Sequence, residues 1–249
     1  MDRLLYTAMT GASGTMNQQA SIAQNLANIS TPGYRAEEHR LRAVQVQTHN
    51  TPAALPTRAF AVDSNTYTDF SAGPMQMTDR PLDVAIKGSG WLAVTAPDGT
   101  EAYTRYGNLQ IDANGTLMTM GGQPVVGDTG PINVPPDQRV VIGDDGTISI
   151  VPKTGLQTSS PIGRLKLVNP DTNAMQRRGD GLFAMKTGLP ADQDDSIRLA
   201  TGYIEGSNVN PAEQLVSMIS LQRQFEMQIQ MITNAEANDK SATAILTVS

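Results

Sequence analysis

The sequence predicts an α+β protein in which two long terminal helices flank an inserted antiparallel β domain. Three observations lead to this prediction: a helix-periodic segment at each end, and a centre of short alternating runs separated by hairpin turns. We expect residues 1–34 and 205–249 to form one discontinuous helical domain and residues 35–79 to form an extended connector with one or two short strands. Residues 80–204 are expected to form a sandwich or barrel.

The N-terminal helix is predicted from apolar residues that recur mostly at steps of three, four and seven between Leu4 and Ile29, which places them on one helix face. The motif Thr31-Pro32-Gly33 then stops the helix, because Pro cannot continue the backbone hydrogen bonds and disfavours helix in the preceding residue. Gly33 follows Pro32 where a type II turn requires positive φ. The apolar positions are Leu5, Met9, Ala12, Met16, Ala23, Leu26 and Ile29.

The C-terminal helix has a clear predicted start. Asn210 is suited to cap it, Pro211 fits the first turn, and Glu213 stands at the capping-box position. Neither Pro nor Gly follows Pro211, so the helix is expected to run close to Ser249. Its periodic positions are Leu215, Met218, Ile219, Gln222, Phe225, Ile229 and Ile232.

We expect these two helices to pair with each other in antiparallel fashion, because each has an apolar stripe close to the narrow seam of a coiled coil. The alternative is that each helix packs on the β domain as an ordinary surface helix. A narrow two-helix pair is marginal alone, so neighbouring subunits are expected to complete its packing. The candidate assembly interface is the seven N-terminal positions given above together with Leu215, Ile219, Phe225, Ile229 and Ile232.

The β domain is predicted from alternating runs at residues 84–86, 91–94 and 109–111. Hairpin turns are predicted where Gly can supply the required backbone angles. These turns are Asp98-Gly99, Asn114-Gly115, Gly121-Gly122 and Asp145-Gly146.

Composition excludes several classes of function. The 249 residues include no Cys and only two His, His39 and His49, so the usual ligands of a catalytic zinc are missing. A net charge of −6 without a basic run is a poor match for nucleic acid. No run approaches about 20 apolar residues, and the first residues lack the pattern of a cleaved signal peptide. We expect no cofactor and no membrane insertion.

No motif predicts a catalytic site. Gly88-Ser89-Gly90 precedes a strand rather than opening a helix, so it is interpreted as a turn. Glu37-Glu38 is interpreted as a solvated pair rather than two facing catalytic carboxylates. Trp91 lies in an apolar strand and is expected in the core. The small residues Gly11 to Gly14 are expected in a helix seam.

Three separated motifs resemble the flagellar rod and hook proteins. They are Asn25-Leu26-Ala27-Asn28-Ile29-Ser30-Thr31-Pro32-Gly33-Tyr34 near the N-terminus, Gly88-Ser89-Gly90-Trp91 in the centre, and Gly206-Ser207-Asn208-Val209-Asn210-Pro211 before the last helix. Within this family the chain is similar to the proximal rod proteins, notably over residues 1–12, 80–86, 163–169 and 223–227.

The resemblance implies a structural subunit of the bacterial flagellar basal body, and no enzyme. Such a chain leaves the cytoplasm through the flagellar type III export apparatus without a cleaved signal. It self-assembles in the periplasm, with other rod proteins and copies of itself, into the axial drive shaft that transmits torque for motility. Terminal helices would form the inner tube of this shaft.

Two other functions stay open on the sequence alone. A peptidoglycan-processing enzyme would need two carboxylates that face each other across a cleft. A secreted binding module, such as an adhesin, would bind its ligand through the β domain without its terminal segments. Neither alternative explains the paired helical ends.

Overall fold

The computed structural model describes residues 2–45, 59–152 and 158–247. It divides into two compact units. We call Met1–Asn28, Ala36–Asp69 and Val209–Ser249 the helix unit, and Ile29–Arg35 with Phe70–Asn208 the β unit. This division differs from the predicted limits at residues 34, 79 and 204. Residues 37–45 and 59–68 belong to the helix unit because they form two strands that pair with each other and contact the N-terminal helix.

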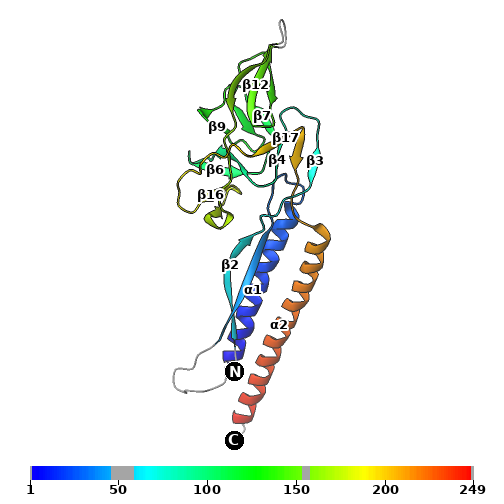
Figure 1. Cartoon of the computed structure of the whole chain (residues 1–249). Helices are drawn as coiled ribbons and strands as arrows, with labels where there is room; N and C mark the ends of the chain where they lie inside the picture. Colours follow the sequence, from blue (N-terminus) through cyan, green and yellow to red (C-terminus); the bar gives the residue numbers. More distant parts are fainter. Residues whose placement is uncertain (1, 46–58, 153–157, 248–249) are drawn as a thin grey trace. The chain divides into compact units, whose positions relative to one another are not determined.

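The helix unit contains two helices, α1 (Asp2–Ala27) and α2 (Pro211–Thr247), and a two-stranded antiparallel ribbon of β1 (Glu37–Gln45) and β2 (Ala59–Thr68). Figure 1 shows α1 with α2 on one side and the ribbon on the other, and α1 contacts all three elements. These strands are longer than the short strands expected in a connector.

The predicted start of the second helix is confirmed. The Asn210 side chain accepts a hydrogen bond from the N–H of Ala212 at 3.1 Å, and Pro211 is the first helical residue. The N-terminal helix is shorter than expected at its end, because α1 stops at Ala27. Ile29, predicted on the apolar stripe of this helix, therefore lies beyond it and belongs to the β unit.

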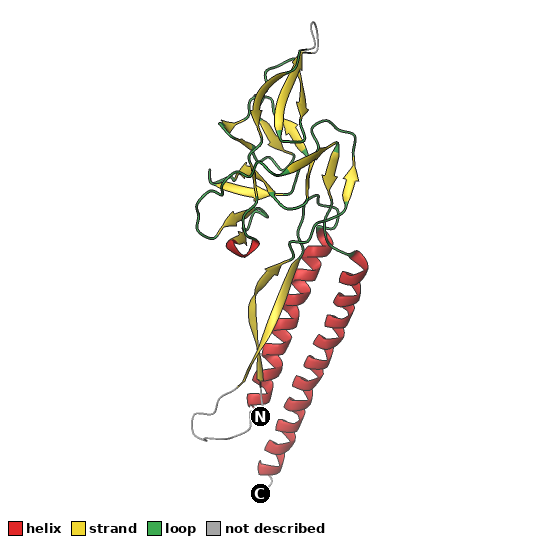
Figure 2. Ribbon diagram, in the orientation of Figure 1, coloured by secondary structure: helices red, strands yellow, loops and turns green. Residues whose placement is uncertain are grey.

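The β unit is built from short antiparallel strands (Figure 2). One sheet has the strand order β14-β5-β6-β16-β15, another has β11-β12-β13, and the pairs β17–β4, β18–β3, β7–β8 and β10–β9 complete it. A short 3-10 helix, η1 (Thr172–Ala174), precedes β15. The strands are β3 (Met75–Met77), β4 (Val84–Lys87), β5 (Trp91–Thr95), β6 (Glu101–Thr104), β7 (Leu109–Ile111), β8 (Leu117–Thr119), β9 (Val126–Gly127), β10 (Gly130–Pro131), β11 (Gln138–Ile142), β12 (Thr147–Pro152), β13 (Ser160–Arg164), β14 (Leu167–Val168), β15 (Met175–Arg177), β16 (Phe183–Met185), β17 (Arg198–Thr201) and β18 (Tyr203–Glu205).

The predicted α+β class is confirmed, whereas a barrel is wrong, because the sheets between residues 75 and 205 in the described part of the chain stay open at their edges. Three of the predicted hairpin turns connect paired strands, namely β5–β6, β7–β8 and β11–β12. Asp98 and Asp145 each accept hydrogen bonds from the backbone and hydroxyl groups of the Thr two residues later, which stabilises these turns.

The two units differ sharply in how much apolar surface they bury. Leu, Ile, Val and aromatic side chains fill the two hydrophobic clusters of the β unit. Among the described residues, the buried apolar side chains of the helix unit are mostly alanines: Ala8, Ala12, Ala36, Val209 and Ala235. Small side chains contribute little free energy on burial, so the helix unit has the weaker core.

Candidate assembly surface

On one face of α2, the residues that the rest of the helix unit covers recur at a regular spacing along the helix. Its half-buried or buried positions advance by alternating steps of four and three residues, which is the heptad spacing of a helix seam. The seam positions are Gln214, Met218, Leu221, Phe225, Gln228, Ile232 and Ala235, and Gln214 and Gln228 are the polar ones. Ser217, beside Met218, is also half-buried.

Contacts across this seam show that α1 and α2 run antiparallel. Thr15 Oγ1 donates to Gln228 Oε1 at 3.2 Å, and Asn25 Nδ2 lies 3.4 Å from Gln214 Oε1. A Cβ on Gly11 would lie 3.0 Å from Gln228 Nε2, so the missing side chain gives α2 room to approach. The interpretation of Gly11 as a small residue of a helix seam is confirmed. Such polar contacts favour one register over others.

The opposite face of α2 is also apolar, but it is exposed. At 100° per residue, Val216, Ile219 and Met227 lie roughly opposite the seam, whereas Leu215, Ile229 and Met231 lie at its sides. Exposed apolar side chains therefore extend from the sides of the seam around to the far face of α2. Exposed fractions range from 43% at Ile229 to 68% at Val216. The exposed apolar residues are Leu215, Val216, Ile219, Met227, Ile229 and Met231. We call this set the outer face of α2.

Helix α1 likewise exposes apolar side chains away from its covered positions. Its outer face consists of Tyr6, Met9, Met16, Ala20 and Ala23. Of the remaining sequence-predicted interface residues on the helices, Ala12 is buried, and Leu5, Leu26, Phe225 and Ile232 are half-buried. The predicted set is thus divided between the seam and the two outer faces.

The motif residue Asn25 joins three elements of the helix unit. Its side chain is 2% exposed and makes two hydrogen bonds to the backbone of Glu37, which begins β1. Asn25 Nδ2 donates to the Glu37 carbonyl at 2.8 Å, and the Glu37 N–H donates to Asn25 Oδ1 at 2.9 Å. With Gln214 as its third neighbour, Asn25 ties α1 to the ribbon and to α2.

The next motif residues form a tight turn inside the β unit. The Tyr34 N–H donates to the Thr31 carbonyl at 3.3 Å, and Gly33 has the predicted positive φ, at 68°. Pro32 precedes Gly33 in this turn, as a type II turn prefers. Tyr34 is buried, with the Arg177 guanidinium 4.7 Å from its ring centroid.

The second terminal motif lies where the chain leaves the β unit. The Asn208 N–H donates to the Tyr34 carbonyl at 3.4 Å, and Asn208 Nδ2 donates to the Ser71 carbonyl at 3.1 Å. Ser207 is buried in the β unit, and Val209 is buried at the start of the last helix-unit segment. Asn28, the remaining residue of the N-terminal motif, donates through Nδ2 to the Gln24 carbonyl at 2.9 Å.

Residues considered for chemistry have structural surroundings. Trp91 is 3% exposed and packs against Phe183 and Phe70, so its predicted core position is confirmed. Glu38 is exposed and pairs with Arg40. Gly88 and Gly90 have positive φ and immediately precede β5, as expected for a turn.

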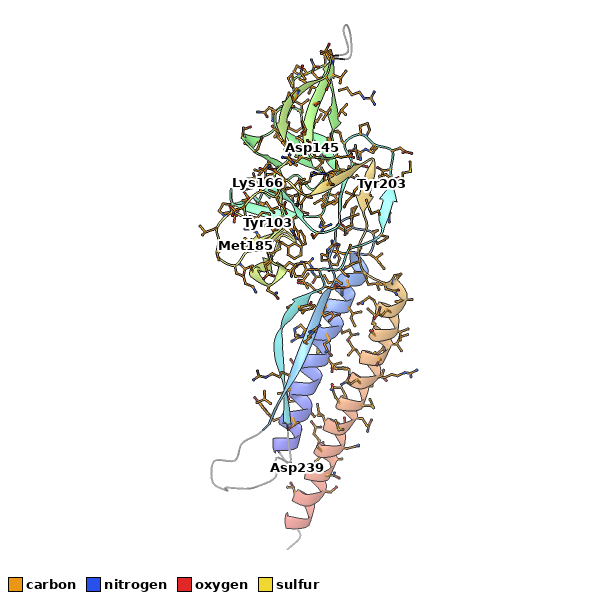
Figure 3. The ribbon with its side chains drawn as sticks, viewed as in Figure 1. Tyr103, Asp145, Lys166, Met185, Tyr203 and Asp239 are labelled. Carbon is orange, nitrogen blue, oxygen red and sulfur yellow. The ribbon has the colours of Figure 1, made fainter. Side chains whose placement is uncertain are left out.

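A partly buried ion pair, Lys166 with Glu101, lies beside this aromatic cluster, to which Tyr103 also belongs. Figure 3 labels Lys166 and Tyr103. Lys166 Nζ donates to both oxygens of Glu101 at 2.8 and 2.9 Å, and the Tyr103 hydroxyl donates to Glu101 at 3.0 Å. Burial raises the pKa of Tyr103 to about 12. The Ala191 N–H in turn donates to the Tyr103 oxygen at 2.6 Å. A cavity of about 480 Å³ opens nearby, between Lys166 and the loop at Asp192.

Within the described ranges, no group of three His, Asp or Glu side chains is arranged to hold a metal ion. Neither α1 nor α2 is long and apolar enough, over its described residues, to cross a membrane.

Three flagellar families match successive parts of the chain. Residues 5–35 match the family described as "Flagella basal body rod protein", and residues 85–150 match "Flagellar hook protein FlgE/F/G D1 domain". Residues 200–245 match "Flagellar basal body rod FlgEFG protein C-terminal". Together these segments include most of α1, the centre of the β unit and most of α2. They define a structural, non-enzymatic protein of the flagellar rod and hook class.

Full-length relatives narrow this class. The chain is 45% identical to "Flagellar basal-body rod protein FlgF" of Salmonella typhimurium and 44% identical to the FlgF of Escherichia coli K12, over the whole of each chain. It is 33% identical to "Flagellar basal-body rod protein FlgG" of Buchnera aphidicola from Schizaphis graminum, over 93% of this chain and 95% of the relative. The chain belongs to the flagellar basal-body rod protein family, with FlgF-type members among its relatives.

Proposed function

We propose that this chain is a subunit of the proximal rod that polymerises, with other rod proteins and copies of itself, into the axial drive shaft. The observation that carries the proposal is the pair of outer faces on α1 and α2. Each outer face is apolar and exposed in a single chain, and together they flank the helix pair. A subunit with two different adhesive faces makes head-to-tail contacts, which generate helical filaments when they do not close into a ring.

The helix pair itself is proposed to be coiled-coil-like. The seam of α2 follows heptad spacing over residues 214–235, and its two Gln positions have polar partners on α1. In the assembly, the outer faces would contact helices of neighbouring subunits. The candidate interface residues Met9, Met16 and Ile219 would then be covered by those neighbours.

The route and compartment form part of the same proposal. We infer export of the chain through the flagellar type III apparatus and assembly in the periplasm. A weak core in the helix unit and the lack of Cys are compatible with passage in an unfolded form. The outer faces would order fully only at the growing tip, where several neighbours enclose them.

The function is tested by deleting the gene in the source bacterium and imaging its basal bodies. We expect non-motile cells whose rods stop before the distal rod and hook, with motility restored by the full chain. A variant without α2, residues 211–247, should be expressed and should leave the cells non-motile. Motile deletion cells with complete rods would contradict a role in the rod. A binding module would instead work without its helices.

Coupling of folding to assembly predicts two separate transitions in the isolated chain. Helical circular dichroism reports chiefly on the helix unit, whereas Trp91, the only Trp, reports on the β unit. Because the helix unit buries mainly Ala side chains, the helical signal should be lost at a lower temperature than the Trp91 signal. Limited proteolysis of the monomer should correspondingly cut residues 4–29 before it cuts the β unit. Coincident transitions and protected residues 4–29 would rule out this coupling.

A further inference from the structure

Three charged side chains gather in the interior of the β unit. Arg35 Nη2 donates to Glu205 Oε1 at 2.7 Å, and Arg105 Nη1 donates to Glu205 Oε2 at 2.8 Å. The side chains of Arg35, Arg105 and Glu205 are 0%, 6% and 3% exposed. We call these residues the Glu205 cluster.

The Glu205 cluster holds two cations and one anion. Both guanidinium groups also lie near the Trp91 ring, with their carbon atoms 5.8 and 5.5 Å from its centroid. Burial lowers the pKa of Arg105, and the charge of Glu205 opposes this effect. Removal of Glu205 would therefore leave two like charges buried, whereas removal of Arg105 would leave a neutral pair.

Glu205 also binds the backbone of two other chain segments. Its carboxylate accepts a hydrogen bond from the Gly73 N–H at 2.9 Å, and its carbonyl accepts one from the Gly33 N–H at 2.7 Å. With the Asn208 bonds to Tyr34 and Ser71, these contacts join three segments of the β unit. The segments are residues 29–35, 70–73 and 205–208, and each continues along the chain into the helix unit.

We propose that Glu205 is a positioning residue for rod assembly, because it gathers at one place in the β unit the three segments through which the chain enters and leaves the helix unit. Its carboxylate neutralises the two arginines and restrains two of these segments, through Arg35 and through the Gly73 N–H. Its backbone carbonyl adds a bond to Gly33 that a side-chain substitution leaves in place. Without it, the segment that contains Arg35 detaches from the β unit while the hydrophobic clusters stay packed. This role concerns the β unit alone and does not depend on which neighbours cover the outer faces.

The test is the variant Glu205→Gln, assayed by trypsin cleavage after Arg35 and followed by mass spectrometry. In the native protein Arg35 is buried and its carbonyl accepts a hydrogen bond from Arg177. The peptide bond between Arg35 and Ala36 is therefore protected from trypsin. In the variant we expect cleavage on the order of a hundredfold faster. Trp91 emission should stay that of a buried Trp, and rod incorporation should be lost. Native-like protection of Arg35, or normal rods, would overturn the proposal.

Two further variants separate charge from general destabilisation. Glu101→Gln removes another partly buried carboxylate of the β unit, paired with Lys166, and should leave cleavage after Arg35 unchanged. Arg105→Met combined with Glu205→Gln lowers the number of buried cations from two to one. It should therefore recover part of the protection of Arg35, even if Glu205→Gln alone unfolds the β unit. A double variant cleaved as fast as Glu205→Gln would refute the charge-based role.

Discussion

Gly33→Val should abolish rod assembly and detach residues 29–35 from the β unit. Two effects add at this position. The φ of Gly33 is 68°, which a β-branched residue adopts only with strain. A Cβ built there would also lie 2.6 Å from the carbonyl oxygen of Arg105 and from the N–H nitrogen of Tyr106. Both obstacles are backbone atoms, so they cannot move aside as a flexible side chain would.

The matched control for this variant is Gly188→Val. Gly188 has nearly the same φ, at 71°, but a Cβ there meets nothing within 4 Å. It therefore carries the backbone strain without the collision, and should cost only about 1–2 kcal/mol. For Gly33→Val we expect a loss of more than about 3 kcal/mol in the β unit. Motility, rod imaging and the thermal transition reported by Trp91 measure the difference. Equal effects at the two glycines would show that the close approach to Arg105 is unimportant.

The elements that could be predicted from the sequence are those set by neighbouring residues. Asn210 and Pro211 mark the start of α2 because capping depends on residues two or three positions apart. The turn at Gly33 follows from Pro32 beside it. Hairpins such as Asp145-Gly146 are local in the same way.

The ribbon and the Glu205 cluster could not be predicted for the opposite reason. Strands β1 and β2 are separated by a long segment, and their pairing depends on α1 beside them. Arg35 and Glu205 are 170 residues apart, and Arg105 and Glu205 are 100 apart. Single charged residues without a local pattern give no sign of such contacts.

The α2 stripe shows how a hydrophobic pattern can combine two surfaces. Gln214 and Gln228 occupy seam positions, whereas the apolar Ile219 lies opposite the seam and Ile229 is exposed at its side. A stripe drawn through apolar residues alone therefore passes from the seam to the outer face. The seam can be identified only from the structure, where the polar residues Gln214 and Gln228 are half-buried. The same observation explains why one helix can pair within its own chain and still present an apolar face to a neighbour.

Ile229→Asp is expected to prevent rod incorporation while leaving the isolated chain almost unchanged. Ile229 belongs to the outer face of α2 and is 43% exposed in the single chain. An exposed substitution of this kind costs the monomer about 0.5 kcal/mol, mostly through the lower helix propensity of Asp. In the rod, a neighbouring helix would cover the site. Loss of the buried side chain would then cost about 2–5 kcal/mol per contact, and the buried carboxylate would add to it.

The effect on the isolated chain and the effect on the rod are distinguished by measuring the melting temperature of the monomer and the incorporation of the variant into rods. Gln224→Asp is the matched control, because Gln224 is exposed on the same helix but is not part of the outer face. It introduces the same charge and should leave both melting and incorporation close to normal. Ile232→Asp, at a half-buried seam position, should instead weaken the helical transition of the monomer. If Ile229→Asp lowers the monomer's melting temperature as much as Ile232→Asp does, the side chain is used within the chain, and the outer face is not an assembly surface.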